Sequence, residues 1–475
     1  MQTHSCLPKR AGIESVFLVL RKHLNRLKSV KKFIQTLKNI WSIEELRNKI
    51  LFTLLLIFIY RLGSFIVLPG IDPNKLANLS NSTKNGMLGL LDAFVGGAFS
   101  KASIFALGIM PYISASIFMQ LITILVPQMA KVQKEGESGR KKINQWTRYL
   151  TVIVTAFQAA AYIGYLKSAG NAEALIPSYA NYFVVSTVIL LTVGTLFVMW
   201  LGEKITDKGL GNGTSIIIMM GILARLPQAF IQEWTSRATR GGGGLLIFLI
   251  EIAFLVAIIM GLILLIQGTR KVPVNYAKQI VGNRQFGGAR NFLPLKVNAS
   301  GVMPIIFAQA ILFLPTIFSG FTGGGWAKYF TDHTNWVYMI VYTICVIAFT
   351  FLYTALIFNP KQMAEDLKRN NGFIPGVKPG QPTADYIGTI MDRITLPGAV
   401  LLAFVGILPG LFQLMFKTQQ AFATFYGGTS LLIMVAVILD TLQQVETQLL
   451  MRQYDGLMSS GRIQGRQTSA VSSGI

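Results

Sequence analysis

Long apolar runs alternate with short polar connections along the chain. The run from Ile50 to Pro69 contains one charged residue, Arg61, and the run from Ser103 to Met129 contains none. About 20 consecutive apolar residues are enough for a helix to cross a bilayer. Ten such runs predict an all-α polytopic membrane protein with ten transmembrane helices, at approximately residues 50–68, 103–126, 148–167, 182–201, 213–231, 245–266, 302–321, 336–358, 395–416 and 425–443.

The composition agrees with a membrane protein. Of the 475 residues, 52% are hydrophobic and only 13% are charged, whereas a soluble domain carries about a quarter charged residues. The net charge of +23 would indicate nucleic acid as the partner of a soluble protein. In this chain, however, the basic residues are concentrated in some of the connections between the apolar runs and not in others. We therefore interpret the charge first as a result of membrane topology.

The distribution of basic residues predicts the orientation. If the N-terminus is cytoplasmic, 33 of the 43 Lys and Arg residues fall on the cytoplasmic side, nine on the outer side, and Arg61 within the first span. Cytoplasmic connections of membrane proteins are enriched in Lys and Arg. We therefore expect an even number of spans and both termini in the cytoplasm.

Two pairs of segments repeat within the chain. Residues 108–115 read GIMPYISA in the second span, and residues 301–308 read GVMPIIFA in the seventh. Residues 213–219 read GTSIIIM in the fifth span, and residues 428–434 read GTSLLIM in the tenth. The spacing predicts two halves of five spans each, which cross the membrane in opposite directions because five is odd.

An inverted repeat of this kind usually builds a path between its halves. Pro111 and Pro304, each three residues after Gly108 and Gly301, are either hinge positions or helix starts that tolerate proline. The predicted units are a basic N-terminal extension (1–30), an N-terminal half (31–243), a C-terminal half (244–456) and a C-terminal tail (457–475).

The chain lacks the residues that other functions need. Among the spans we note only Arg61, Glu251 and Asp440 as ionisable, whereas ion-coupled transporters place such residues inside their spans. No P-loop, nucleophile–base pair or metal-ligand spacing is present, so we expect no enzyme activity, metal or cofactor. A conduit driven by a partner therefore fits better than a small-solute transporter or a structural scaffold.

Two further stretches have more than one interpretation. Residues 267–302 contain six basic residues and no acid, which fits a docking loop for a large acidic or nucleic-acid partner or a plain solvated loop. Residues 88–100 read LGLLDAFVGGAFS, too short to span the membrane, and fit either an interfacial helix or a plug folded into the mouth of a pore. Arg61 is either structural or lines a cavity, and we favour the structural role.

Several stretches resemble the SecY family, the channel-forming subunit of the bacterial Sec translocon, and the resemblance extends roughly from Lys31 to Gln453. Residues 1–30 match nothing in the family pattern. The matching stretches are GAFSKASIFALGIMPYISAS at 97–116, VNYAK at 274–278, LPLKVN at 293–298, NP at 359–360 and PGVKPG at 375–380.

The resemblance implies a central pore subunit in the cytoplasmic membrane. It would export unfolded preproteins and release membrane proteins sideways into lipid. A ring of aliphatic side chains would narrow the pore, at Ile109, Ile113, Ile218, Ile306 and Ile433. A plug would close it, at about residues 88–100 and including Leu90, Leu91, Phe94, Gly96 and Gly97.

The resemblance also implies a lateral gate between spans 2–3 and 7–8, with Gln120, Thr123 and Gln309 as candidate contacts. Loops 267–302 and 359–394 would dock the SecA motor ATPase and the ribosome, through Arg270, Lys271, Lys278, Arg284, Arg290 and Lys378. Lys378 stands where the family often has Arg, and Lys lacks the planar fork of a bidentate contact. The other implied partners are the small membrane subunits SecE and SecG, the preprotein with its signal peptide, and membrane lipid.

Overall fold

The computed structural model describes most of the membrane-spanning part of the chain. The predicted N-terminal extension and the chain beyond residue 459 lie outside the described residues. The residues that the structure describes are 41, 43–72, 92, 94–168, 180–239, 244–276, 279–281, 284–286, 290–309, 312, 335–418, 420–423, 425 and 428–459.

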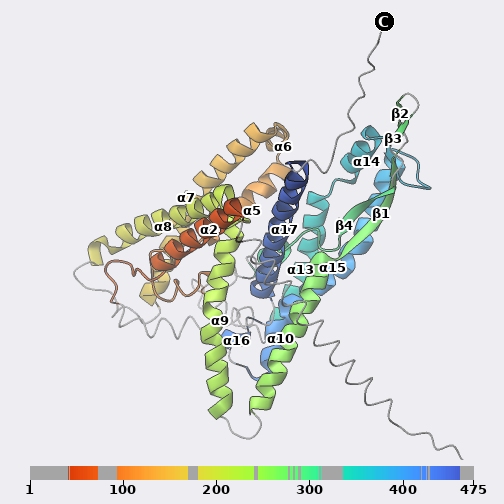
Figure 1. Cartoon of the computed structure of the whole chain (residues 1–475). Coiled ribbons are helices and arrows are strands. Elements are labelled where there is room, and N and C mark those ends of the chain that lie inside the picture. Colours follow the sequence, from red (N-terminus) through yellow and green to blue (C-terminus); the bar gives the residue numbers. More distant parts are fainter. Residues whose placement is uncertain are drawn as a thin grey trace, which may run out of the picture.

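The first group of helices comes from the N-terminal part of the chain (Figure 1). Helix α7 packs between α5 and α8, and α8 in turn contacts α2 and α9. Helices α5 and α6 meet at a bend of 105° next to Pro127, since proline at a helix start cannot donate to the preceding turn. The helices are α2 (Glu44–Gly63), α5 (Met110–Leu125), α6 (Pro127–Lys134), α7 (Glu137–Ser168), α8 (Ala180–Lys208) and α9 (Gly213–Thr239).

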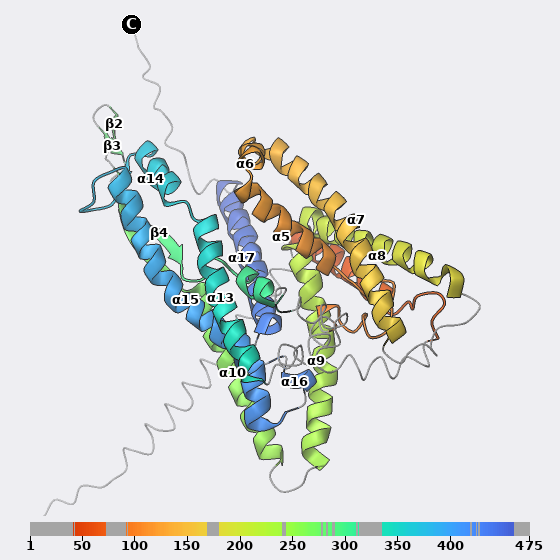
Figure 2. The same ribbon diagram turned by 180° about the vertical axis from the view of Figure 1, so that it is seen from behind.

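The second group lies beside the first and meets it through α9, which contacts both α10 and α17 (Figure 2). Within the group, α15 packs against α13 and α14, and α17 packs against α10 and α15. The helices are α10 (Gly244–Gln267), α13 (Trp336–Ile357), α14 (Pro360–Arg369), α15 (Gln381–Phe416), α16 (Gln420–Ala423) and α17 (Gly428–Ser459).

A small β-arm joins the two loops that the sequence marks for docking. Strand β1 (Thr269–Tyr276) pairs antiparallel with β4 (Arg290–Lys296) on one side and with β5 (Gly372–Phe373) on the other. Strands β2 (Gln279–Val281) and β3 (Arg284–Phe286) form a separate hairpin. The arm and α6 lie at one end of the molecule, and the end of α9 and the start of α10 lie at the other (Figures 1 and 2).

The helical membrane fold predicted from the sequence is confirmed. Six described helices are long and apolar enough to cross a membrane, or seven if α5 and α6 form one broken span. Helices α2 and α7 coincide with the first and third predicted spans but carry charged residues in their first turns. Of the seventh predicted span, only residues 302–309 and 312 are described. The count of ten is consistent with these helices.

Candidate pore and gate

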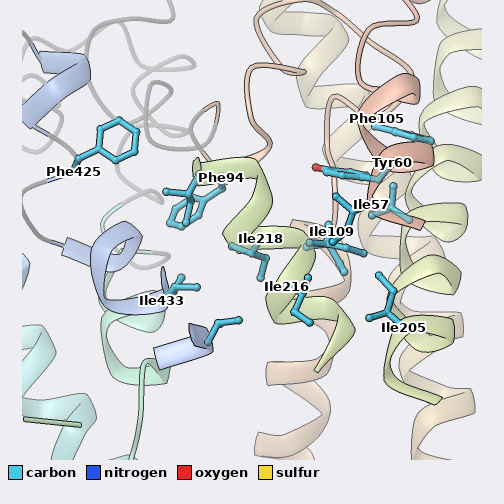
Figure 3. Close-up of a cluster of buried hydrophobic side chains, with 14 of the residues drawn as sticks. Ile57, Tyr60, Phe94, Phe105, Ile109, Ile205, Ile216, Ile218, Phe425 and Ile433 are labelled. Carbon is cyan, nitrogen blue, oxygen red and sulfur yellow. The ribbon is translucent and has the colours of Figure 1, made fainter. Parts of the chain in front are cut away.

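Five isoleucines proposed for the pore ring lie in a single hydrophobic cluster. Ile109, Ile218 and Ile433 are buried in it, and Ile113 and Ile306 pack against it partly exposed. They come from the start of α5, from α9, from the helical residues 303–309 and from α17. Three of them are drawn in Figure 3. Four separate segments thus contribute branched aliphatic side chains to one cluster.

Glycines set the position of α9 next to this cluster. A Cβ at Gly213 would lie 2.0 Å from the carbonyl oxygen of Gly202, so α8 and α9 approach backbone to backbone at this point. Gly213 is the first residue of one of the repeated segments. Gly108 and Gly301, at the start of the other pair, have φ angles of 54° and 65°, a backbone conformation that side chains with a Cβ disfavour. Both glycines therefore turn the chain into the helices that follow them.

Part of the proposed plug packs against the same cluster. Phe94 is buried in it (Figure 3). Gly96 and Gly97 follow with φ angles of 68° and 89°, so the chain turns sharply there. Leu90 and Leu91 lie outside the described residues. Residues 92 and 94–100 are called the 92–100 segment below.

Polar contacts attach the 92–100 segment to three helices, α2, α7 and α9. From α7, the Tyr162 hydroxyl donates to the Phe99 carbonyl oxygen over 2.8 Å. The Asp92 carboxylate accepts a hydrogen bond of 2.9 Å from the Ser100 backbone N–H through Oδ1, and its Oδ2 forms an ion pair with Arg225 Nη2 of α9. Arg225 Nη2 also lies 3.2 Å from Ser100 Oγ. On the other side, Arg61 Nη1 of α2 lies 3.4 Å from the Gly96 carbonyl oxygen. Arg61 therefore contacts this segment, in addition to the Phe65 ring at 5.7 Å.

Asp92 and Arg225 were missed by the sequence analysis. Arg225 lies inside α9 and inside the predicted fifth span, but it was not among the ionisable residues noted there. The sequence did contain two signals: Arg225 is a basic residue within an apolar run, and Asp92 is the acid in the otherwise apolar stretch 88–100. The sequence does not say that these two residues meet, because 133 positions separate them.

The three gate candidates have different contacts. Gln120 of α5 accepts a hydrogen bond of 2.8 Å from the hydroxyl of Tyr353 in α13, so this contact joins the two groups of helices. Thr123 instead donates to carbonyl oxygens of its own helix. Gln309 lies 3.3 Å from the Thr429 hydroxyl of α17. Of the three candidates, only Gln120 reaches the opposite group through these contacts.

The docking candidates lie on or near the β-arm. Arg270 and Lys271 are exposed on β1, and Lys378 is exposed in the connection between β5 and α15. Arg284 and Arg290 belong to β3 and β4, and Lys278 lies outside the described residues. Because β5 pairs with β1, the two predicted docking loops form one surface.

A buried cluster of charges joins α9 to α10. Arg237 donates to Glu233 Oε1 over 2.7 Å and to Glu251 Oε1 over 2.6 Å. Its Nη2 also donates to the carbonyl oxygen of Phe416, the last residue of α15, over 2.7 Å. The sequence analysis noted Glu251 alone. The three contacts tie together one helix of the first group and two of the second.

Comparisons with known proteins agree with this architecture. The family model described as SecY matches residues 103–442. The protein translocase subunit SecY of Escherichia coli strain K12 is 41% identical over 430 residues, which cover 89% of this chain and 96% of that protein.

Two solved structures share the fold. One is described as "The plug domain of the SecY protein stablizes the closed state of the translocation channel and maintains a membrane seal", with a TM-score of 0.57 and 16% identity, over 84% of this chain and 92% of that one. The other is Sec61 in the canine ribosome–channel complex from the endoplasmic reticulum, with a TM-score of 0.55 and 14% identity, over 84% and 92% of the two chains.

Proposed function

This chain belongs to the SecY family and is the central pore subunit of a protein-conducting channel, and from this premise we propose how its own residues form and close the path. The subunit is a multi-pass membrane protein and a channel, not an enzyme. Unfolded preproteins cross the cytoplasmic membrane through it, and apolar segments leave it sideways into lipid. We assign both termini to the cytoplasm, on the strength of the basic connections.

The pore ring consists of Ile109, Ile113, Ile218, Ile306 and Ile433. The observation that carries this assignment is their convergence from four segments on one hydrophobic cluster. An apolar constriction excludes ions and water when it is closed. Because the side chains come from four separate segments and are apolar, the ring itself has no hydrogen bond to break when it widens around a polypeptide.

The 92–100 segment acts as the plug. Its Phe94 packs into the cluster that contains the ring, and polar contacts attach it to α2, α7 and α9. A segment in this position adds a second layer to the apolar seal. It has to move before a polypeptide passes.

The lateral gate runs between α5 and the helices that contain Phe307 and Tyr353. The hydrogen bond between Tyr353 and Gln120 holds α5 against α13 and so keeps the gate closed at this point. The Phe307 ring stacks on Phe349 with 5.6 Å between centroids, so aromatic packing fixes the far side. Separation of α5 from α13 would open a path from the pore to lipid.

The exposed basic β-arm binds the driving partner. We assign it to the SecA motor ATPase and to the ribosome, both of which present acidic or phosphate-rich surfaces to a basic site. The small membrane subunits SecE and SecG complete the complex. Chain passage then depends on work done by the partner, which fits the scarcity of ionisable residues in the spans.

Reconstitution tests the function. Vesicles that contain this chain, the motor ATPase and the small subunits should import a preprotein in the presence of ATP, measured by protection from protease. No import under these conditions would refute the proposal.

A ring variant tests the assignment of residues. Replacement of Ile113, Ile306 and Ile433 by Gly should raise the resting ion leak of the vesicles several-fold, because the constriction loses its side chains. The matched control replaces Ile189, Ile231 and Ile438, which are exposed at 57%, 60% and 43%, by Gly. Both variants carry the same helix penalty of about 1 kcal/mol per Gly. Equal leak in the two variants would refute the ring.

A further inference from the structure

A pocket of about 330 Å³ lies between α7 and α8, at the level where their apolar runs end. The two helices pack against each other (Figure 2). Arg148 of α7 is the first residue of the predicted third span, and the predicted fourth span ends at Leu201 of α8. The pocket therefore lies at the height of the lipid headgroups. Its lining residues are Arg148, Met199, Trp200, Glu203, Lys204 and Asp207.

We propose that this pocket binds the headgroup of one phospholipid that carries a phosphate and a primary ammonium, the headgroup chemistry of phosphatidylethanolamine. Two of the lining side chains are basic and two are acidic: Arg148, Lys204, Glu203 and Asp207. A headgroup with one charge of each sign is complementary to this lining. A purely anionic headgroup would instead place its charge next to two carboxylates.

One basic and one acidic side chain of the pocket are already paired with each other. Arg148 donates to Glu203 through Nε over 3.1 Å and through Nη2 over 2.6 Å, a bidentate contact that joins α7 to α8. This pair forms a wall of the pocket. Within the part of the chain that the structure describes, Lys204 lies 5.9 Å from the Trp200 ring and Asp207 forms no ion pair. Lys204 and Asp207 are therefore the side chains left for a ligand.

The spacing of Lys204 and Asp207 suits an ethanolamine headgroup. Residues three apart on a helix are neighbours, with about 5–6 Å between their Cβ atoms. Only two carbons and an ester oxygen separate the ammonium from the phosphorus, so one headgroup can reach both side chains. Lys204 donates to the phosphate, and Asp207 accepts from the ammonium. A choline headgroup has no N–H to donate and loses the second contact.

An exposed apolar stripe on α8 leads from the hydrocarbon region into the pocket. Its residues follow one another at steps of three or four and are Ile189, Val193, Phe197 and Trp200. Such positions share one face of a helix, and Lys204 is the next on that face. Phe197 stacks on Trp200 with 5.8 Å between ring centroids, which holds the indole at the junction. An acyl chain can therefore lie along the stripe while its headgroup occupies the pocket, with tryptophan at the membrane–water interface where it is common.

An apolar helix of a partner subunit is the other occupant that this face could take. Such a helix would cover the stripe but would bring no charge to Lys204 and Asp207. Covering two charged groups without partners is costly. The zwitterionic headgroup pairs with both of them, and for this reason we assign the pocket to lipid.

Native mass spectrometry of the purified complex, with its small membrane subunits, measures the binding. The complex is washed free of lipid in detergent and then titrated with phosphatidylethanolamine, phosphatidylcholine or phosphatidylglycerol that have the same acyl chains. Retention is the fraction of the complex that holds one lipid at a given lipid concentration. We expect wild type to retain phosphatidylethanolamine about fivefold more than either of the other lipids, which corresponds to one hydrogen bond to a charged group.

Two variants separate the roles of the phosphate and the ammonium. Lys204→Gln should lower retention of phosphatidylethanolamine about fivefold, because the phosphate loses its partner. Asp207→Asn should lower it by a similar factor without lowering retention of phosphatidylglycerol, because only the ammonium uses this carboxylate. The matched controls are Lys208→Gln and Asp440→Asn, which change exposed residues outside the pocket and should leave retention within about twofold of wild type. Lys204→Arg retains the positive charge and should also stay within about twofold.

Three results would overturn the lipid site. The first is equal retention of phosphatidylethanolamine by wild type and both pocket variants. The second is equal retention of all three lipids by wild type, which indicates unspecific binding to an apolar surface. The third is retention by the isolated chain that disappears when the small subunits are present, since a partner helix would then occupy the pocket. None of these results depends on preprotein import, so the lipid site and the proposed function are tested separately.

Discussion

Replacement of Arg237 by Met would remove the one positive charge from the buried cluster between α9 and α10. The side chains of Arg237, Glu233 and Glu251 are 5%, 1% and 0% exposed. Met has a similar length and leaves no large cavity, so the effect comes from the charges. Two buried carboxylates would then lose the Arg237 guanidinium, and the Phe416 carbonyl would lose its donor.

The expected loss is considerable. Removal of one partner of a buried ion pair costs about 3–5 kcal/mol. Cooperative unfolding carries roughly 2.1 cal/mol/K per residue, or about 1 kcal/mol/K for a chain of this length. The melting temperature should therefore fall by at least about 3–5 °C, and by more if helices persist in the denatured state.

Thermal melting of the purified protein in detergent measures this loss. The matched control is Arg148→Met, which breaks the exposed pair with Glu203 and should cost about 0–1 kcal/mol. Conversion of both glutamates to Gln in the Arg237→Met background should recover most of the stability, since no unpaired charge is left. Equal melting temperatures for the Arg237 and Arg148 variants would refute the reasoning.

Two further predictions concern the plug and the gate. Gly221→Ala places a Cβ 2.2 Å from the Phe94 carbonyl oxygen, so the 92–100 segment has to move by about 1 Å to reach normal contact, and the resting ion leak of the vesicles should rise. The control is Gly164→Ala, whose Cβ would have no atom within 4 Å. Equal leak in the two variants would contradict the packing of this segment on α9 as part of the seal. Tyr353→Phe removes the donor to Gln120, and a hydrogen bond worth about 1 kcal/mol should favour gate opening roughly fivefold. Cross-linking of a signal segment to lipid-facing positions measures this shift. An equal cross-linking yield in wild type and Tyr353→Phe would argue against a role of the Tyr353–Gln120 hydrogen bond in closing the gate.

The positions of the helices could be predicted from the sequence, but several of their ends could not. Helix α7 begins at Glu137, well before its apolar run, and α15 begins at Gln381. Helix α17 continues to Ser459. Hydropathy marks only the part of a helix that lies in hydrocarbon, whereas backbone hydrogen bonds continue the helix into the polar region. The apolar runs therefore underestimate helix length where the polar residues are good helix formers.

The β-arm was not predicted, although its residues were singled out. Strand β1 alternates, with Val272 and Val274 buried and Lys271 and Pro273 exposed, which is a strand pattern that the basic residues obscured. Its pairing with Phe373 of β5 joins positions about a hundred residues apart. Local patterns do not specify such a partner. The ring isoleucines were proposed from the family resemblance, and four of the five lie at equivalent positions of the two repeated pairs of segments.

The structure combines two kinds of contact with different mechanical consequences. The isoleucine cluster is apolar and non-directional, so its side chains can separate gradually around clients of different size. The Asp92–Arg225 pair and the Arg237 cluster are directional, and their carboxylates are buried, so each is either formed or broken at a definite cost. The first pair holds the 92–100 segment, which we propose as the plug, and the second lies where the two groups of helices meet. We infer that the apolar ring adapts to the client, whereas the charged contacts divide the motion into discrete closed and open states.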